Sequence, residues 1–217
     1  TDGGTTWTSA KPAWLTAFTA SGNGGTTASN YTATVSAQQG IASPGIPHTE
    51  ILQNATPKGS SSAPYDLSMY DVDGNAQPGM TTANCYVVRA PGTYRIPLVY
   101  GKAVKNGATN TDSYNPGGVT EKIYLATFVK HDNTAISDPC LEDNSGVVPA
   151  NATLLWNDAN ANFMTVNSEL STYTATIDGA GRQLQYIVFT IDKAGIQQGN
   201  AVIAVRDASD VVLWSWH

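Results

Sequence analysis

Three oxygen-bearing side chains at alternate positions could hold a metal ion. Asp71, Asp73 and Asn75 match the start of a calcium-binding loop. The run then departs from that loop, because Ala76 stands where the loop has glycine and Thr82 where it has a bidentate glutamate. An Asp-Gly turn between two strands explains the same residues. The three residues are therefore a candidate metal site, with the turn as the favoured alternative.

The two cysteines, Cys85 and Cys140, are candidates for a disulfide. A bond between them would close a long loop and stabilise the fold by about 4 kcal/mol in the chain-entropy model. The alternative, two buried free thiols, fits the sequence equally well. Zinc is not expected, because a structural zinc ion needs four clustered ligands.

Aromatic side chains offer another kind of chemistry, since an exposed indole can stack on a sugar ring. Trp14, Trp214 and Trp216 are the candidates for ligand binding, and the last two share one face of a strand because they alternate across Ser215. If that face is turned inward it is core, and if it is turned outward it is a binding platform. The inward orientation is favoured, because most large aromatic side chains fill cores.

No sequence pattern for catalysis is present. The sequence has no nucleophile elbow, no zinc-protease motif and no glycine-rich phosphate loop. The three histidines lie far apart, and the few glutamates occur in polar contexts typical of solvated loops. We therefore expect a protein that is not an enzyme and that has no catalytic residue and no cofactor. Two carboxylates roughly 5 to 9.5 Å apart in a cleft would instead favour a hydrolase.

Composition narrows the choice of partner. Charged residues make up 13% of the 217 positions, about half of the usual fraction, and the formal net charge is −6. Nucleic acid and anionic membrane surfaces are not expected partners, because the chain offers no basic patch for phosphates. No apolar run reaches the ~18 residues of a membrane span. Residues 1–6 are small and polar, which indicates a processed chain or a piece of a longer protein.

Strand signals recur along the first half of the chain. Residues 31–35 alternate in polarity, and residues 85–88 are separated from residues 94–99 by Ala-Pro-Gly. That turn predicts a hairpin. Pro97 has no amide hydrogen to donate, so we expect an edge or a bulge there.

The second half of the chain predicts two further hairpins. One joins residues 173–177 to 184–191 across a glycine-rich turn, and the other joins residues 201–205 to 211–216. Helix signals are nearly absent, with 20 glycines and 11 prolines in the chain. The pattern predicts an all-β, antiparallel, immunoglobulin-like β-sandwich with few or no helices.

The first part of the chain resembles a known module. Pro-Ala-Trp-Leu-Thr at residues 12–16, Ser-Gly-Asn-Gly-Gly at residues 21–25 and the alternating run at residues 31–35 resemble the closing strands of a BACON domain. BACON domains are immunoglobulin-like modules of Bacteroidetes surface proteins. The resemblance assigns residues 1–40 to the end of such a module, whose earlier strands would lie upstream.

The remainder of the chain is similar to fimbrillin-like cell-surface proteins of Bacteroidetes. The similarity rests on residues 82–94, on Pro-Leu-Val-Tyr-Gly at residues 97–101 and on residues 199–217. It assigns residues 41–217 to a fimbrillin-like β-sandwich domain. In that group the chain continues past the Trp-Ser-Trp-His segment through further strand residues, whereas this sequence stops there.

The resemblance implies a lipoprotein or a fimbrium subunit at the cell surface, attached to the outer membrane through a region outside this chain. Neighbouring subunits would join by β-strand addition, in which main-chain hydrogen bonds provide affinity and alternate side chains provide register. Residues 211–216 have the character of a donated or groove-lining strand. An intramolecular hairpin with residues 201–205 is the favoured alternative, because the connecting turn is short.

These observations predict cell adhesion or a fimbria-associated role at the tip or along the shaft of a pilus. The alternative is a carbohydrate-binding module of a surface glycan-utilisation or mucin-binding protein. In that case the partner is a host or mucin glycan.

Overall fold

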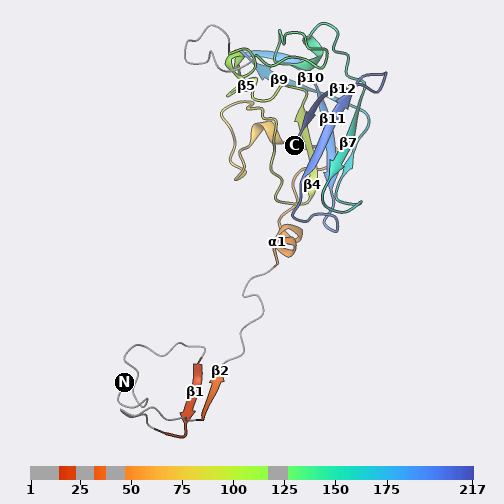
Figure 1. The fold of residues 1–217 in the computed structure, drawn as a ribbon. Helices are drawn as coiled ribbons and strands as arrows, with labels where there is room; N and C mark the ends of the chain where they lie inside the picture. Colours follow the sequence, from red (N-terminus) through yellow and green to blue (C-terminus); the bar gives the residue numbers. More distant parts are fainter. Residues whose placement is uncertain (1–14, 23–31, 38–46, 117–126) are drawn as a thin grey trace. The chain divides into compact units, whose positions relative to one another are not determined.

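Strands dominate the part of the chain that the structure describes (Figure 1). The structure is a computed structural model, and it describes residues 15–22, 32–37, 47–116 and 127–217. The chain divides into two compact units, Thr1–Ile46 and Pro47–His217.

The first unit contains one two-stranded antiparallel sheet. Its strands are β1 (Leu15–Ala20) and β2 (Ala33–Ala37), and Phe18 pairs with Val35. Both of these side chains are exposed. The ligand-binding candidate Trp14 lies outside the described residues.

The second unit contains one described α-helix, α1 (His48–Asn54), together with short 3₁₀ helices and strands. The described 3₁₀ helices are η1 (Leu67–Met69), η2 (Thr111–Ser113) and η4 (Leu141–Asp143). The described strands are β3 (Tyr65–Asp66), β4 (Gly92–Pro97), β5 (Val104–Lys105), β6 (Ala108–Thr109), β7 (Asn151–Asn157), β8 (Thr165–Val166), β9 (Ser171–Ile177), β10 (Ala180–Ile191), β11 (Ala201–Arg206) and β12 (Val212–Trp216). No helix among the described residues is long and apolar enough to cross a membrane.

Most strands of the second unit lie in two larger sheets (Figure 1). In the first, β10 pairs antiparallel with β4, β8 and β9, and β3 adds to β4 in parallel. In the second, β11 pairs antiparallel with β12 and β7. Strands β5 and β6 form a small separate hairpin. The prediction of a mostly antiparallel β protein with few helices is therefore confirmed.

Both hairpins predicted in the second half of the chain are present. Strands β9 and β10 are joined by Asp178 and Gly179, whose φ angles of 53° and 76° are those of a tight hairpin turn. Between β11 and β12, the Asp207 carboxylate accepts hydrogen bonds from the amides of Ser209 and Val211. The turn-forming residues between each pair of strands therefore determine where the two hairpins form.

The hairpin predicted between residues 85–88 and 94–99 is wrong. Strand β4 begins at Gly92, where the main chain of Lys58 approaches so closely that a Cβ atom would lie 1.9 Å from the Lys58 oxygen. Its ladder partner is β10, with Tyr94 opposite Phe189. Pro97 is the last residue of β4, beyond the part that β3 covers, so its missing amide hydrogen breaks no bond to β3.

One hydrophobic core is shared by the two larger sheets. Ile96, Ile187 and Phe189 contribute from the first sheet, and Val205 and Trp216 contribute from the second. Each of these side chains is at most 4% exposed. Side chains from β4, β10, β11 and β12 therefore fill a common interior.

Asn144 stabilises the loop of residues 137–144, which precedes β7 and which we call the Asn144 loop. Its side chain is buried, with Oδ1 accepting hydrogen bonds from the amides of Ser137 and Asp138 at 2.8 and 3.3 Å. Its Nδ2 donates to the carbonyl oxygens of Asp138 and Cys140 at 2.9 and 2.7 Å. This one amide therefore satisfies several main-chain groups of an irregular segment whose described sheet pairing is the single bridge between Cys140 and Val99.

Replacing Asn144 by alanine should destabilise the fold by at least about 2 kcal/mol, because several buried polar groups lose their partner. Urea denaturation measures the change. Asn115→Ala is the control, since Asn115 is exposed, and it should change stability by less than about 0.5 kcal/mol. Equal stabilities for the two variants would contradict the role assigned to Asn144.

Candidate functional site

The two cysteines are free in the structure, so the predicted disulfide is absent. Cys140 is fully buried and pairs with Val99 in an isolated bridge. Cys85 is exposed, with its sulfur 3.6 Å from Nδ1 of His217. Of the two buried thiols in the alternative, only Cys140 is buried. The contact between the Cys85 thiol and the His217 imidazole was not predicted from the sequence.

The candidate metal residues form a turn. The Asp71 carboxylate accepts hydrogen bonds from the amides of Asp73 and Asn75 and from Nδ2 of Asn75, all within 3.0 Å. The bonds from Asn75 are the main cause that lowers the pKa of Asp71. Asp73 in turn bonds Arg89 at 3.1 Å. The turn alternative thus describes these residues, since both carboxylate oxygens of Asp71 and one of Asp73 already have partners in the protein.

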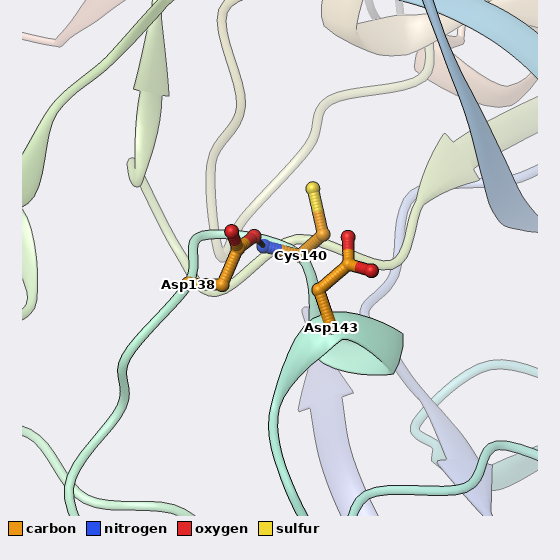
Figure 2. Close-up of side chains that lie close together, drawn as sticks. All are labelled: Asp138, Cys140 and Asp143. Atoms are coloured by element: carbon orange, nitrogen blue, oxygen red, sulfur yellow. Dashed lines mark hydrogen bonds between the residues drawn. The ribbon is translucent and has the colours of Figure 1, made fainter.

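A different cluster of potential metal ligands is brought together by the fold. Among the described histidine, cysteine, aspartate and glutamate side chains, the ligand atoms of Asp138, Cys140 and Asp143 lie within 4.8 Å of one another. Figure 2 shows the three side chains next to one another, with Cys140 drawn between Asp138 and Asp143. Nothing in the local sequence predicts this cluster, although all three residues lie within one short segment.

The cationic partner of this cluster is Arg182 of β10. Its Nη2 lies 3.2 Å from Oδ1 of Asp138 and also bonds Oδ2 of Asp143. Burial raises the pKa of the Cys140 thiol, although Arg182 opposes that effect. A neutral thiol is a poor metal ligand. The cluster therefore connects the Asn144 loop to β10 through an ion pair with Arg182, and its protonated thiol does not favour a metal ion.

Glu142 makes a second contact between the Asn144 loop and β10. Its Oε1 accepts a hydrogen bond from the amide of Gln185 at 2.9 Å, while Oε2 is buried without a partner among the described residues. Burial raises the pKa of Glu142, and the charge of Asp143 adds to the rise, while the Gln185 amide and Arg182 oppose it. The folded protein therefore favours the protonated carboxyl group at this position.

Trp214 and Trp216 differ in their surroundings. Trp216 is buried in the core, as favoured from the sequence. Trp214 is half-buried, donates from Nε1 to Oδ1 of Asn84 at 2.8 Å and meets the ring of Tyr100 edge-on, with centroids 5.0 Å apart. Of these two tryptophans, only Trp214 therefore presents part of its aromatic surface to solvent.

Trp214 lies in a hollow that we call the aromatic hollow. Four aromatic side chains line it, from Tyr100, Tyr114, Phe128 and Trp214, and its volume is about 430 Å³. Phe128 is 58% exposed, so part of the lining faces solvent. Lys102 and Asn84 add polar groups to the lining. A hollow of this size with aromatic walls and few polar groups is typical of a small-ligand site.

Two exposed apolar residues on an edge strand of the second unit were not predicted from the sequence. Leu155 and Trp156 of β7 are 40% and 52% exposed. The signal was present, because Leu154, Leu155 and Trp156 form a continuous apolar run rather than the alternation of a half-buried strand. Such a run requires cover on both faces of the strand, and the described residues cover it only in part.

Comparisons with protein-family models, with curated proteins and with solved structures found no match. The BACON-like and fimbrillin-like resemblances therefore stay predictions.

Glu142→Gln should make the protein more stable at neutral pH than the unchanged protein. A carboxyl group whose pKa is raised by folding contributes its stability below its unfolded pKa of about 4.3, and the contribution is lost as the pH rises through the folded pKa. The advantage of the variant should therefore shrink as the pH falls toward about 4.

Urea denaturation at neutral pH and in mild acid measures this difference. Glu169→Gln controls for the change in net charge, because Glu169 is exposed. An advantage of Glu142→Gln that is equal at both pH values would contradict the assigned cause.

Proposed function

We propose that this chain is a non-enzymatic adhesion or fimbria-associated protein of the bacterial cell surface, built as an immunoglobulin-like, fimbrillin-like β-sandwich. The observation that supports this function best is the apolar edge of β7. Two larger sheets that share one core support the sandwich. Attachment to the outer membrane through a region outside this chain is part of the proposal.

Strand β7 is the last strand of its sheet, whose order is β12-β11-β7. On its outer side the described main-chain contact is the bond from the amide of Ala152 to the oxygen of Ser168. Leu155 and Trp156 lie beyond that bond, where the register with β11 shifts between Val202 and Ile203 and leaves Leu155 without a ladder partner. An added strand would gain main-chain hydrogen bonds here and cover both side chains.

The other edge of this sheet is less open. Strand β12 pairs with β11, so the intramolecular hairpin alternative for residues 211–216 is what the structure contains. After β12, His217 exchanges main-chain hydrogen bonds with Asn84 and Tyr86, both at 2.8 Å. We therefore propose β7, and not residues 211–216, as the strand that receives a neighbouring subunit.

The ion pairs within this unit favour recognition of a neighbouring subunit through apolar side chains and main-chain groups. Arg95 bonds Asp66 at 3.0 Å, Arg182 bonds the Asn144 loop, and Arg206 bonds Asp210 at 2.9 Å. These cations have partners within their own unit. In a chain with only 13% charged residues, few charged side chains remain to oppose strand addition at the edge of a sheet.

The chain should form concentration-dependent assemblies through β7, and Trp156→Lys should weaken them at least tenfold, because a lysine on an edge strand opposes strand addition. Sedimentation velocity over a range of concentrations measures the assembly. Val72→Lys is the matched control, since Val72 is 49% exposed and lies in the turn at Asp71. A chain that stays monomeric and binds neither mucin nor cells would refute the proposal.

Carbohydrate binding in the aromatic hollow is the second candidate function. The supporting observation is the set of four aromatic side chains, of which Trp214 and Phe128 are partly exposed. Exposed aromatic faces stack on the apolar faces of sugar rings. The function would make this chain a glycan-binding module and would leave the edge of β7 unused.

A glycan array tests this second function. Phe128→Ala should remove any binding, because it deletes the most exposed ring of the hollow. Val129→Ala is the control, since Val129 is 41% exposed and does not line the hollow. Binding that survives Phe128→Ala would place the glycan elsewhere on the protein.

A further inference from the structure

Cys85 and His217 form a thiol–imidazole pair directly after β12. The Cys85 sulfur lies 3.6 Å from Nδ1 of His217, and both residues are exposed. The amide of His217 donates to the oxygen of Asn84, and the amide of Tyr86 donates to the oxygen of His217, both at 2.8 Å. This is the bonding pattern of parallel strands, and it places His217 opposite Cys85. The main chain therefore holds the two side chains next to each other.

An imidazole beside a thiol can take its proton. When His217 carries its ring proton on Nε2, its Nδ1 can accept the proton of the Cys85 thiol. The thiolate is the nucleophilic form of cysteine, and a neighbouring base is a common means of generating it. The charge of His217 is among the causes that lower the pKa of Asp158, after the hydrogen bonds from Asn200. A carboxylate in this neighbourhood favours the imidazolium that forms when the thiol loses its proton.

The other cysteine has the opposite surroundings. Cys140 is fully buried, and burial raises the pKa of its thiol. A neutral, inaccessible thiol does not act as a nucleophile. Cys140 is therefore an internal control for any reaction that takes place at Cys85.

An apolar hollow, which we call the intersheet hollow, lies beside the thiol–imidazole pair. Its lining includes Cys85 and His217 together with core side chains of both larger sheets, namely Ile96, Phe189, Ile191 and Ile203. No atom of a cysteine lies more than about 5 Å from its own sulfur, so a group bonded to Cys85 has this hollow within reach. The hollow has a volume of about 290 Å³.

The lining restricts what such a group can be. Among the described residues that line the intersheet hollow there is no aspartate, glutamate, lysine or arginine. A charged group would lose its hydration here without gaining a fixed counter-charge. At about 30 Å³ for each non-hydrogen atom, the volume holds on the order of ten such atoms. An uncharged aliphatic chain of about eight carbons meets both limits.

We infer that Cys85 is a modification site that accepts a medium-length acyl group from an acyl thioester, with His217 as the base and the intersheet hollow holding the acyl chain. The Cys85 thiolate attacks the carbonyl carbon of the thioester. A carbon–sulfur bond to Cys85 forms, and the bond to the sulfur of the departing thiol breaks. The proton that His217 took passes to the departing thiolate, so the step needs neither an oxidant nor a reductant. This site does not depend on strand addition at β7.

The octanoyl and acetyl thioesters of N-acetylcysteamine test the inference as a matched pair, because they share a leaving group and differ only in the length of the acyl chain. Intact mass spectrometry of the unchanged protein follows the gain of one acyl group. The octanoyl compound should react at least tenfold faster, because its chain is buried in the intersheet hollow. Peptide mapping should place the group on Cys85 and leave Cys140 unmodified, and hydroxylamine, which cleaves thioesters, should remove it.

Three variants separate the nucleophile, the base and the hollow. Cys85→Ser should abolish the gain in mass. His217→Gln should slow the reaction of both compounds at least tenfold, because the proton acceptor is lost. Ala201→Leu adds bulk to the lining from β11 and should slow the octanoyl compound alone. Far-ultraviolet circular dichroism checks the fold of each variant.

An ordinary exposed thiol controls for intrinsic reactivity. The double variant Cys85→Ser, Ser61→Cys carries its thiol at an exposed position that does not line the intersheet hollow. It should react with the octanoyl compound at least tenfold more slowly than the unchanged protein, and it should not distinguish the two chain lengths.

Three outcomes would overturn the inference. The first is an equal rate for the unchanged protein and the double variant. The second is an acetyl compound that reacts with the unchanged protein as fast as the octanoyl compound. The third is an acyl group found on Cys140. Trp156→Lys should be acylated like the unchanged protein, so a failure of strand addition and a failure of this inference are distinguishable.

Discussion

The second unit depends on strand β10, which pairs with three other strands and is covered on both faces. Strand β10 bonds β4, β8 and β9, and its side chains from Tyr186 to Phe189 are buried on both faces. The amide of Gln185 bonds Glu142, and its oxygen accepts from the amide of Leu98. Sheet, loop and core therefore meet along β10, and a change in its register would displace all three.

Charged groups in this protein serve mainly to hold that arrangement. The guanidinium of Arg95 bonds Asp66 and lies 3.9 Å from the ring centroid of Tyr173, and Arg182 joins the Asn144 loop to β10. Buried or partly buried ion pairs of this kind fix geometry more than they add stability. Recognition through apolar side chains and main-chain groups is therefore what we propose for the edge of β7 and for the aromatic hollow.

Features that depend on neighbouring residues could be predicted from the sequence, and features that depend on distant residues could not. The turn at Asp178 and the turn at Asp71 were predictable, because each is specified by a few neighbouring residues. The partner of β4 was not, because it lies in a distant part of the sequence, and neither was the Asp138 cluster, which needs Arg182 to assemble. Trp216 is core, as favoured from the sequence, whereas the exposure of Trp156 was not predicted, because its strand contains a continuous apolar run and no alternation.

The pairing of Tyr94 with Phe189 has a consequence for how the protein reaches its fold. Strand β4 has only the two-residue strand β3 and Lys58 as sheet partners until β10 is available. Contacts between such distant segments form slowly, because a long loop must close first. The sheet that contains β4 is therefore completed only after the second half of this unit has been synthesised.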